Sequence, residues 1–275
     1  ISSERKQDVY YQKVTNLIKK MREFHNWIKS VIIYTYCSPT RREVNGKIMR
    51  QSLLDIGCGR GGDILKMYHA RVGEYVGFDP DYEGIYSSTD GAISRYNLYK
   101  SKFPDFGKVT YFLGDGGVKL EGDAQMKSLS NMSQENKQII DKIFTKDKRF
   151  DTFSSQFVIH YLFGSTTSID NLVYNINNFL RKDGYILLTL LDGDLVHKKF
   201  GDGTSITSNY TDEEGQRTKL FEIVKKYSGG LSKDVGSPVD IHMSWISDEY
   251  KYIEEYLVSE ELMLKTMKRA GCKLV

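Results

Sequence analysis

Residues 52–63 have the sequence Ser-Leu-Leu-Asp-Ile-Gly-Cys-Gly-Arg-Gly-Gly-Asp, and this stretch decides the fold. An apolar run ends at Asp55 and is followed by a glycine-rich segment and then by an amphipathic segment that begins at Ile64. This order predicts a buried strand, a glycine-lined turn and the first turn of a helix. In an open α/β sheet, small ligands bind just beyond the carboxyl ends of the strands. We therefore expect the turn to bind a nucleotide-like cofactor, with Asp79 at the end of the next strand close to it.

Two classes of cofactor are compatible with the glycine turn. Gly57, Gly59 and Gly62 satisfy the G-x-G-x-x-G pattern of dinucleotide-binding folds, and Asp79 follows Gly57 by 22 residues. A dinucleotide places its pyrophosphate at the positive end of the helix, where the Asp55 carboxylate would repel it. S-adenosylmethionine has no phosphate and carries an ammonium and a sulfonium group, which a carboxylate attracts. The pattern D-x-G-x-G-x-G-G therefore favours S-adenosylmethionine over nicotinamide or flavin; a tight turn without a ligand is the simpler alternative.

The composition is that of a globular α/β protein. The chain has 275 residues, of which 40% are hydrophobic, enough to bury a sizeable core in one domain with insertions. No apolar run approaches the roughly 20 residues of a membrane span, and no signal peptide is evident, so we expect no membrane association. The three cysteines have no metal-ligand spacing and are too few for a disulfide framework. This predicts an intracellular, reducing setting and no metal site.

The net charge of +3 is mild, but basic residues cluster in the front part of the chain. One such cluster consists of Arg41, Arg42, Lys47 and Arg50. Solvated helix and loop faces would explain these charges without any ligand. Contacts with a phosphate backbone are the functional alternative, and they would make binding depend on salt concentration.

Apolar runs and helical periodicity alternate along the chain. Apolar side chains at helical spacing predict an amphipathic helix over residues 8–30, followed by a polar linker over 38–50. Strands are predicted at Ser52–Asp55, Glu74–Asp79, Lys108–Leu113, Thr152–Gln156 and Tyr185–Leu191. Helices are predicted at 61–69, 85–102, 168–181 and 259–270. This alternation predicts a mostly parallel sheet with helices on both faces.

Aspartates lie at the ends of the first three predicted strands, at positions 55, 79 and 115. One aspartate at a strand end is often only a turn residue, but three form a pattern. The Asp79 carboxylate is suited to accept hydrogen bonds from both ribose hydroxyls of an adenosine, and Asp115 from the adenine amino group. The fourth strand runs into His160 and Tyr161, which are suited to hold a flat heterocycle by hydrogen bonds and stacking. A lone histidine there would more often be structural.

Four separated blocks of the sequence resemble the mRNA cap guanine-N7 methyltransferases. They are Asn26-Trp-Ile-Lys-Ser30, Leu54-Asp-Ile-Gly-Cys-Gly-Arg-Gly-Gly-Asp63, Gln156-Phe-Val-Ile-His-Tyr161 and Glu255-Tyr-Leu-Val258. The blocks span nearly the whole chain in the family's order. The similarity is greatest to the methyltransferase domains of capping enzymes from large cytoplasmic DNA viruses, the African swine fever virus type. It implies a class I, Rossmann-like, S-adenosylmethionine-dependent methyltransferase with a mostly parallel, seven-stranded-type sheet.

The resemblance implies a cofactor site in which Lys29 binds the methionine carboxylate and Asp55 and Gly57 lie near the amino group. Asp79 would bind the ribose and Asp115 the adenine. The residues implied for the cofactor are Lys29, Asp55, Gly57, Gly59, Asp79, Asp115 and Gln156. Gln156 would bridge toward the methionine part and the transfer site. S-adenosylhomocysteine would be the product.

The resemblance also implies a pocket for the cap guanine, lined by Asn26, His160, Tyr161 and Glu255. Guanine N7 carries a lone pair and no proton, so methyl transfer needs no general base and we expect none. A carboxylate bonded to the guanine N1 and N2 protons would favour the transition state, because positive charge grows on the ring. Glu255 is the expected carboxylate; the alternative is a solvent-facing acid at a helix start.

The resemblance further implies a domain plan and partners. A helical segment and basic linker over residues 1–50 would contribute to the cofactor site. Residues 51–275 would form the methyltransferase core, with a polar insertion near 116–149 and a cap-side subdomain near 201–258. Capped RNA would be the substrate, with triphosphatase and guanylyltransferase domains on the same polypeptide, in the host cytoplasm or virion. Two alternatives stay open: an inactive cap- or RNA-binding module that stimulates a partner, and a methyltransferase for another RNA or a small molecule.

Overall fold

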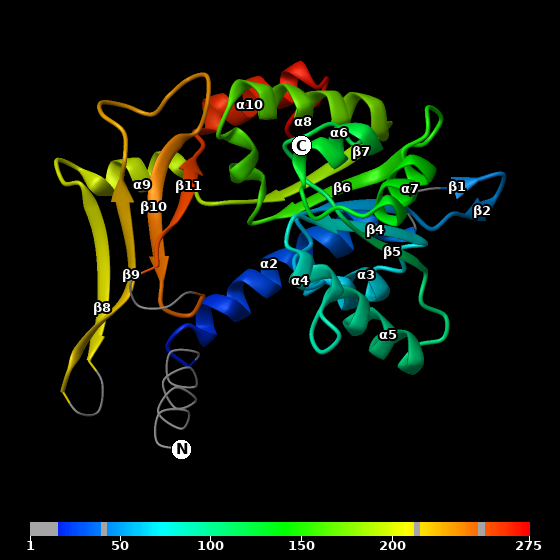
Figure 1. Cartoon of the computed structure of the whole chain (residues 1–275), viewed down its shortest axis with the longest axis horizontal. Helices are drawn as coiled ribbons and strands as arrows, with labels where there is room; N and C mark the ends of the chain where they lie inside the picture. The colour runs from blue at the N-terminus through cyan, green and yellow to red at the C-terminus, as the bar shows by residue number, and fades with distance from the viewer. Residues whose placement is uncertain (1–15, 40–42, 212–214, 247–250) are drawn as a thin grey trace. The chain divides into compact units, whose positions relative to one another are not determined.

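The computed structural model describes residues 16–39, 43–211, 215–246 and 251–275 (Figure 1). The chain divides into two compact units. One unit comprises the described residues up to Ile28 together with Leu191–Met263, and we call it the antiparallel-sheet unit. The other comprises Lys29–Leu190 and Leu264–Val275, and we call it the parallel-sheet unit.

A parallel sheet forms the centre of the parallel-sheet unit, as predicted. Its strands are β3 (Ser52–Ile56), β4 (Glu74–Asp79), β5 (Lys108–Leu113), β6 (Phe150–Gln156) and β7 (Leu180–Thr189). They are hydrogen-bonded in the order β5-β4-β3-β6-β7, and every pairing is parallel. From β3 the chain proceeds outward to β4 and β5 and then returns to β6 on the other side. The topological switch point, where ligands bind in such sheets, therefore lies between β3 and β6.

Five strands form this sheet in the described part of the chain, fewer than the seven-stranded type expected from the resemblance. The four strands that follow β7 pair with one another in a separate antiparallel sheet. The C-terminal residues Cys272–Val275 have no regular structure and add no strand to this sheet. Leu274 and Val275 are 77% and 78% exposed, because no neighbouring strand of the described residues covers them.

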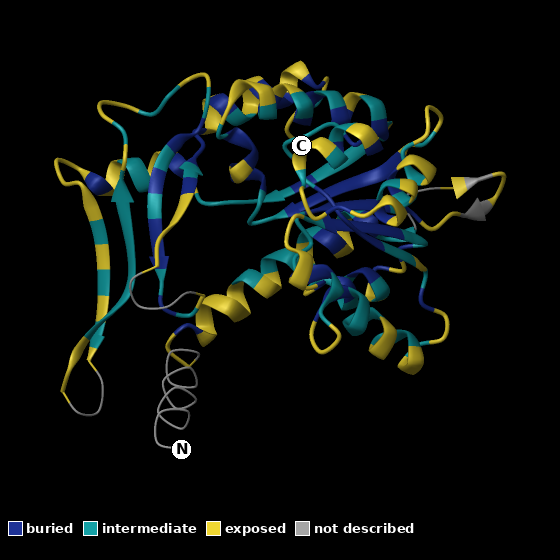
Figure 2. Ribbon diagram, in the orientation of Figure 1, coloured by how far each residue is buried: buried dark blue, intermediate teal, exposed yellow. Residues whose placement is uncertain are grey.

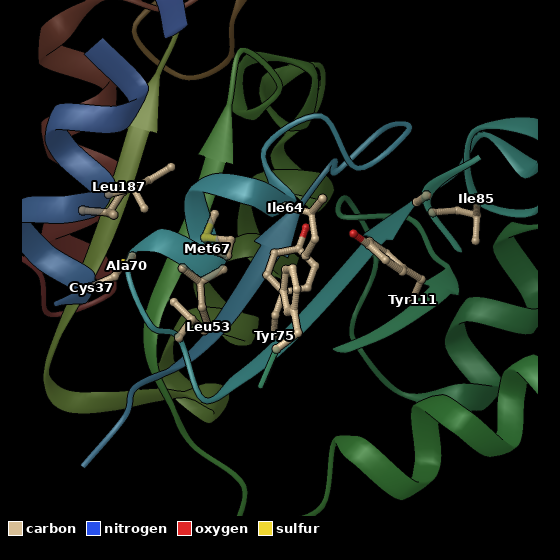
Figure 3. Close-up of a cluster of buried hydrophobic side chains, with 13 residues drawn as sticks. Cys37, Leu53, Ile64, Met67, Ala70, Tyr75, Ile85, Tyr111 and Leu187 are labelled. Atoms are coloured by element: carbon tan, nitrogen blue, oxygen red, sulfur yellow. The ribbon is translucent and has the colours of Figure 1, made fainter. Parts of the chain in front are cut away.

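Helices cover the two faces of the parallel sheet. They are α2 (Lys19–Cys37), α3 (Ile64–His69), α4 (Tyr82–Tyr86), α5 (Ala92–Lys102), α6 (Gly122–Ser128), α7 (Gln134–Ile143), α8 (Thr166–Phe179), α10 (Glu260–Arg269) and the 3₁₀ turn η2 (Ile159–Phe163). On one face, Cys37 of α2 and Ile64 of α3 pack with Leu53 and Tyr75 of the sheet (Figure 3). Strands β3, β4 and β6 are buried along most of their length, whereas most of β7 is only half-buried (Figure 2). Apolar burial on both faces is what holds a parallel sheet together.

The N-terminal helix differs from the prediction of residues 8–30. Helix α2 continues to Cys37, and residues 8–15 lie outside the described residues. The β-branched run at 31–33 disfavours a helix, but Ile33 and Cys37 are fully buried in the core, and this packing outweighs propensity. Part of the predicted linker forms the hairpin β1 (Glu43–Val44) and β2 (Lys47–Ile48). Arg41 and Arg42 lie outside the described residues.

Residues 116–149, which we interpreted as a polar insertion, contain α6 and α7 and connect β5 to β6. The side chain of Asn136 on α7 is buried and bonds to both backbone groups of Leu113, each at 2.8 Å. Ile140 of the same helix is fully buried. The polar residues of this segment therefore hold the end of β5.

An antiparallel sheet of four strands and one helix form the other unit. The strands are β8 (Ser205–Thr211), β9 (Arg217–Lys225), β10 (Ser237–Met243) and β11 (Ile253–Leu257), and the helix is α9 (Gly193–Phe200). The strand order is β11-β10-β9-β8, and every pairing is antiparallel. Phe200, Val239, Ile241 and Leu257 form its core. Across the described residues of the whole chain, no helix combines the length and apolar character required to cross a membrane.

Candidate cofactor and substrate site

The glycine turn after β3 lies at the switch point of the parallel sheet. The backbone N–H groups of Gly57 and Cys58 both donate to the carbonyl of Phe78, which joins the turn to β4. Gly57 has φ +75°, and a Cβ atom there would lie 2.3 Å from the Val158 side chain. Both its conformation and the available space therefore require glycine. Gly59, with φ +51°, directs the chain back toward Asp79.

Asp79 at the end of β4 holds this turn in place. One carboxylate oxygen accepts the Gly59 N–H at 2.8 Å, and the other accepts the Asp81 N–H at 2.9 Å. Burial raises the pKa of Asp79, against the opposing effect of these two backbone donors. Each carboxylate oxygen has a further lone pair, so Asp79 can accept two more hydrogen bonds from a vicinal diol.

Asp115, just beyond β5, is positioned by the segment 116–149. Its carboxylate accepts hydrogen bonds from the N–H of Gly117 and the hydroxyl of Ser128, each at 2.8 Å. Its backbone N–H donates to the side chain of Gln125 at 2.8 Å, and its carbonyl accepts from the same amide at 2.9 Å. Gln125 is fully buried on α6. The expected adenine-side residue therefore has both its backbone and its carboxylate fixed.

Asp55 lies beneath the turn, on the face of the sheet that α2 and α3 cover. It is only 4% exposed and accepts a hydrogen bond of 2.7 Å from the hydroxyl of Tyr75. Burial raises the pKa of Asp55 to about 7, although the bond from Tyr75 and the charge of Lys29 lower it. The carboxyl group is therefore close to half ionised at neutral pH. A cation bound nearby would favour its charged form.

Lys29 of α2 meets Asp63, a residue to which the sequence gave us no reason to assign a function. The Lys29 ammonium lies 2.8 Å from one carboxylate oxygen of Asp63 and 2.9 Å from the other. Lys66 lies 2.8 Å from the same carboxylate. Burial raises the pKa of Asp63, but the two lysines outweigh this effect and the pKa is lowered. Together the three groups carry one excess positive charge, which suits an anionic ligand group.

The sequence gives no indication that Asp63 has a role in the site. It occupies the N-cap position of α3, where aspartate is common for structural reasons. Its side chain makes no capping hydrogen bond. The pairing with Lys29 spans 34 residues of sequence, so no local pattern predicts it.

Gln156, the last residue of β6, has its amide oriented by its neighbours. Its nitrogen donates to the carbonyl of Leu187 at 3.1 Å, and its oxygen accepts from the hydroxyl of Thr189 at 3.0 Å. The next residue, Phe157, has φ +61°, a left-handed conformation that costs a bulky residue about 1–3 kcal/mol. Its N–H donates to Thr189 at 2.8 Å. This strained residue turns the chain from β6 into η2.

His160 and Tyr161 lie together in η2 but differ in exposure. Their ring centroids are 4.3 Å apart with a tilt of 36°. His160 is 4% exposed, whereas Tyr161 is 39% exposed. Tyr161 is therefore the member of the pair whose ring is accessible from solvent, whereas His160 is buried.

Asn26 and Glu255 belong to the antiparallel-sheet unit. Asn26 is exposed on α2, one turn before Lys29. Glu255 lies within β11, opposite Val239 of β10, and is only 7% exposed, whereas Glu254 is exposed. The alternative of a solvent-facing acid at a helix start is therefore wrong for Glu255. Its placement in a strand next to the apolar core was not predicted.

A family model described as the mRNA (guanine-N(7))-methyltransferase domain matches residues 2–213. The chain belongs to this family. Its members transfer the methyl group of S-adenosylmethionine to N7 of the guanine cap of mRNA. The match covers more than half of the chain and includes the glycine turn, Asp79, Asp115 and η2. The family resemblance drawn from the four sequence blocks is thereby confirmed.

Two relatives of similar sequence agree with this assignment. The chain is 39% identical, over 97% of its length, to a "Probable mRNA-capping enzyme" of Acanthamoeba polyphaga mimivirus, of which it spans 22%. It is 24% identical, over 98% of its length, to mRNA cap guanine-N(7) methyltransferase 1 of Arabidopsis thaliana, spanning 71% of that protein. A crystal structure of Streptomyces venezuelae DesVI superposes with a TM-score of 0.49 and 13% identity, covering 94% of this chain and 89% of the other.

The residues at the carboxyl edge of the parallel sheet fit the cofactor of the family. The excess charge of Lys29, Lys66 and Asp63 suits a carboxylate. Asp55 gains charge when a cation binds near it, and Asp79 keeps two acceptor positions for a diol. The Asp55 carboxylate beneath the glycine turn would oppose a pyrophosphate bound there, so a dinucleotide fits less well.

Proposed function

We propose that this chain methylates N7 of the guanine cap of mRNA, using S-adenosylmethionine as donor, and that its own catalytic contribution is positioning and electrostatics. The observation that carries the proposal is the family match over residues 2–213, in a chain whose strand-end carboxylates are individually fixed. Capped RNA is the substrate of this family. The chain spans 22% of the length of the viral capping enzyme, so the capping activity of a longer polypeptide that contains this chain is part of the same proposal.

In the proposed cofactor site, each residue meets one part of the donor. Lys29, held by Asp63, binds the methionine carboxylate, while Asp55 lies on the ammonium side of the Gly57–Gly59 turn. Asp79 accepts hydrogen bonds from the ribose hydroxyls. Asp115 accepts one from the adenine amino group, and Gln156 orients the methionine part toward the acceptor.

In the proposed cap site, Tyr161 offers its exposed ring to the guanine, and His160 supports that ring from behind. Glu255 accepts hydrogen bonds from the guanine N1 and N2 protons. Asn26 adds a polar contact from α2. Stacking combined with bonds to the base edge is the usual way in which a protein holds a single RNA base.

The proposed chemistry requires no proton transfer at the acceptor. When bound, S-adenosylmethionine supplies an electrophilic methyl group on a sulfonium. The chain aligns N7 with that group, and such positioning can account for a large share of the acceleration. As positive charge develops on the guanine ring, the Glu255 carboxylate stabilises it, and this contact strengthens in the transition state.

The viral relative supports a proposal for the cellular context. We infer that triphosphatase and guanylyltransferase domains accompany this chain on one polypeptide, because the similar mimivirus protein is named a capping enzyme and is several times longer. The same relative supports action in the host cytoplasm or in the virion.

The proposal is tested with the methyl donor labelled and three RNAs that differ only at the 5′ end. They end in an unmethylated guanosine cap, a triphosphate and an already N7-methylated cap. The proposal expects label only in the first RNA. Equal labelling of the triphosphate RNA would indicate a different RNA methyltransferase. No labelling of any RNA, with intact binding of the capped one, would indicate an inactive stimulatory module.

A further inference from the structure

A small basic pocket lies at the amino-terminal edge of the parallel sheet, where the proposed function has no role for it. It is formed by the segments that precede β3, β4 and β5, and its cavity volume is about 200 Å³. The side chains that carry its chemistry are Arg50, Tyr68, His69, Arg71 and Asp105. Arg50, His69 and Arg71 are exposed and therefore accessible to a ligand.

The walls of the pocket are fixed by backbone geometry. Helix α3 ends in a Schellman motif, in which the Arg71 N–H donates to Tyr68 at 2.9 Å and the Val72 N–H donates to Met67 at 3.0 Å. Gly107 approaches Val72 so closely that a Cβ atom would lie 2.4 Å from its carbonyl oxygen. The segments before β4 and β5 are thus held against each other. A ligand would therefore meet a preformed site.

The backbone of Arg71 has a conformation that is unfavourable for a residue with a side chain. Its φ of +56° is left-handed, and the Schellman position it fills is normally glycine. The arginine side chain contributes nothing to the hydrogen bonds of this motif, which are made by the backbone. A binding role for the guanidinium in the pocket explains why arginine, and not the more stable glycine, occupies this position.

The charge of the pocket suits a phosphate. Arg50 and Arg71 each carry a guanidinium, whose planar donors match two oxygens of a phosphate. Asp105 supplies one opposing charge, and one of its oxygens accepts the Tyr68 hydroxyl at 3.2 Å. Burial and Asp105 raise the pKa of Tyr68, while the charges of Arg71 and Arg50 lower it, so both guanidinium groups act on this wall. Tyr68 itself is held by stacking on Phe103, with centroids 4.5 Å apart.

The size and position of the pocket exclude a second cofactor site. Its volume is below the roughly 300–1,000 Å³ of pockets that enclose a drug-sized ligand, so it accommodates one anionic group rather than a whole nucleotide cofactor. Arg50 precedes β3, whereas Gly57 follows it. The length of this five-residue strand, about 17 Å, separates the pocket from the glycine turn.

We propose that the pocket between Arg50 and Arg71 binds a phosphate group of the RNA strand, at a distance from the cap. The assignment to RNA rests on the proposed function, because RNA is the polyanion that the family handles. Binding there would add affinity for the transcript without touching the guanine. A free phosphate or pyrophosphate is the other source of the same chemistry.

The test measures the binding of a labelled, uncapped oligouridylate by fluorescence anisotropy, without methyl donor. Arg71→Gly and Arg50→Gln are each expected to weaken binding by about five- to tenfold. Each should also reduce the slope of log affinity against log salt by about 0.7, the value for one phosphate contact of a single strand. Asp105→Asn should tighten binding, because it removes the opposing charge. Arg269→Gln, an exposed arginine of α10 paired with Asp170, is the matched control and should leave affinity unchanged.

The melting temperature of each variant shows whether a loss of RNA affinity is caused by unfolding. Arg71→Gly should melt no lower than the wild type, since glycine relieves the left-handed backbone, so its loss of RNA affinity could not be ascribed to unfolding. Unchanged affinity and salt slope in both arginine variants would overturn the proposal. If pyrophosphate binding by calorimetry is lost in Arg71→Gly while RNA binding is not, the site serves a free anion and the RNA assignment is overturned. None of these readouts depends on methyl transfer, so a failure of the proposed function would be seen separately.

Discussion

The hydroxyl of Tyr75 donates a hydrogen bond of 2.7 Å to the carboxylate of Asp55, and both residues are buried beneath the glycine turn. This bond lowers the pKa of Asp55, yet burial dominates and the pKa stays at about 7. The residue that favoured S-adenosylmethionine over a dinucleotide is therefore a group that titrates near physiological pH. Its charge in the free protein depends on pH, and cofactor binding should depend on pH with it.

We predict that the affinity for S-adenosylmethionine rises with pH through neutrality. Asp55 must be ionised to pair with the ammonium group, and with a pKa of about 7 its ionised fraction increases from about one tenth at pH 6 to about nine tenths at pH 8. The dissociation constant measured by calorimetry should therefore fall by about tenfold over this interval. Affinity falls at low pH because protonation of Asp55 removes the negative charge that attracts the ammonium group.

Two variants isolate this effect from titration of the cofactor's own amino group. Asp55→Asn should bind weakly and lack the Asp55 contribution to the pH dependence. Tyr75→Phe removes the hydrogen bond that lowers the pKa, so the midpoint should move to higher pH while tight binding is kept at the alkaline end. A wild-type pH profile that Asp55→Asn reproduces would show that this carboxylate does not contact the cation.

Asp79 gives a prediction that separates the two ligands. Asp79→Ala removes an acceptor for the ribose and also the partner of the Gly59 N–H. Cofactor affinity should fall by about 10- to 100-fold, the scale of a lost charged hydrogen bond. Binding of a cap analogue should change by less than about threefold, because Asp79 lies on the cofactor side. Calorimetry with each ligand in turn measures both; parallel losses would argue against the separation.

Asp63 is predicted to act through Lys29. Asp63→Asn removes the charge that holds the Lys29 ammonium, so the KM for S-adenosylmethionine should rise by about tenfold with little change in the KM for capped RNA. Lys66→Met is the comparison variant, because it keeps the Lys29–Asp63 pair and removes the excess positive charge of the cluster. A larger rise in the KM for S-adenosylmethionine in Lys66→Met than in Asp63→Asn would show that the net charge of the cluster, and not the position of Lys29, governs cofactor binding.

Glu255 is predicted to contribute to the transition state. Glu255→Ala should reduce kcat/KM for capped RNA by the equivalent of about 2–4 kcal/mol. Glu255→Gln keeps the shape and removes the charge, so it should recover folding but little of the activity. The exposed neighbour Glu254→Ala should be close to wild type. Activity of Glu255→Ala within a few fold of wild type would remove Glu255 from the cap site.

The sequence predicted the parts of the fold that depend on local pattern. The bounds of β4 and β5 coincide with the predicted strands, because apolar runs end in aspartate or glycine at both. The extension of α2 to Cys37 was not predictable, since residues 31–37 are helical only through packing of Ile33 and Cys37 into the core. The hairpin around Asn45–Gly46 had a recognisable signal, a dipeptide that favours the type I′ turn.

The site was predictable where it consists of strand ends, and not where it depends on long-range pairing. Asp79 and Asp115 follow from the carboxyl edge of a parallel sheet. The partners of the site aspartates come from elsewhere in the chain. Tyr75, which donates to Asp55, resembles an ordinary core residue of β4, and Gln125, which holds Asp115, lies in a segment that we interpreted as an insertion. Burial of Glu255 within β11 likewise required the pairing of β10 and β11.

Identifying the methylated atom shows whether this chain methylates N7 of the cap guanine. The protein is incubated with a labelled methyl donor and RNA carrying an unmethylated guanosine cap, and the RNA is digested to nucleosides and cap fragments. We predict that the label co-migrates with N7-methylguanosine released from the cap, and that internal nucleosides stay unlabelled. Label on a ribose, on an exocyclic amine or on an internal base would contradict it.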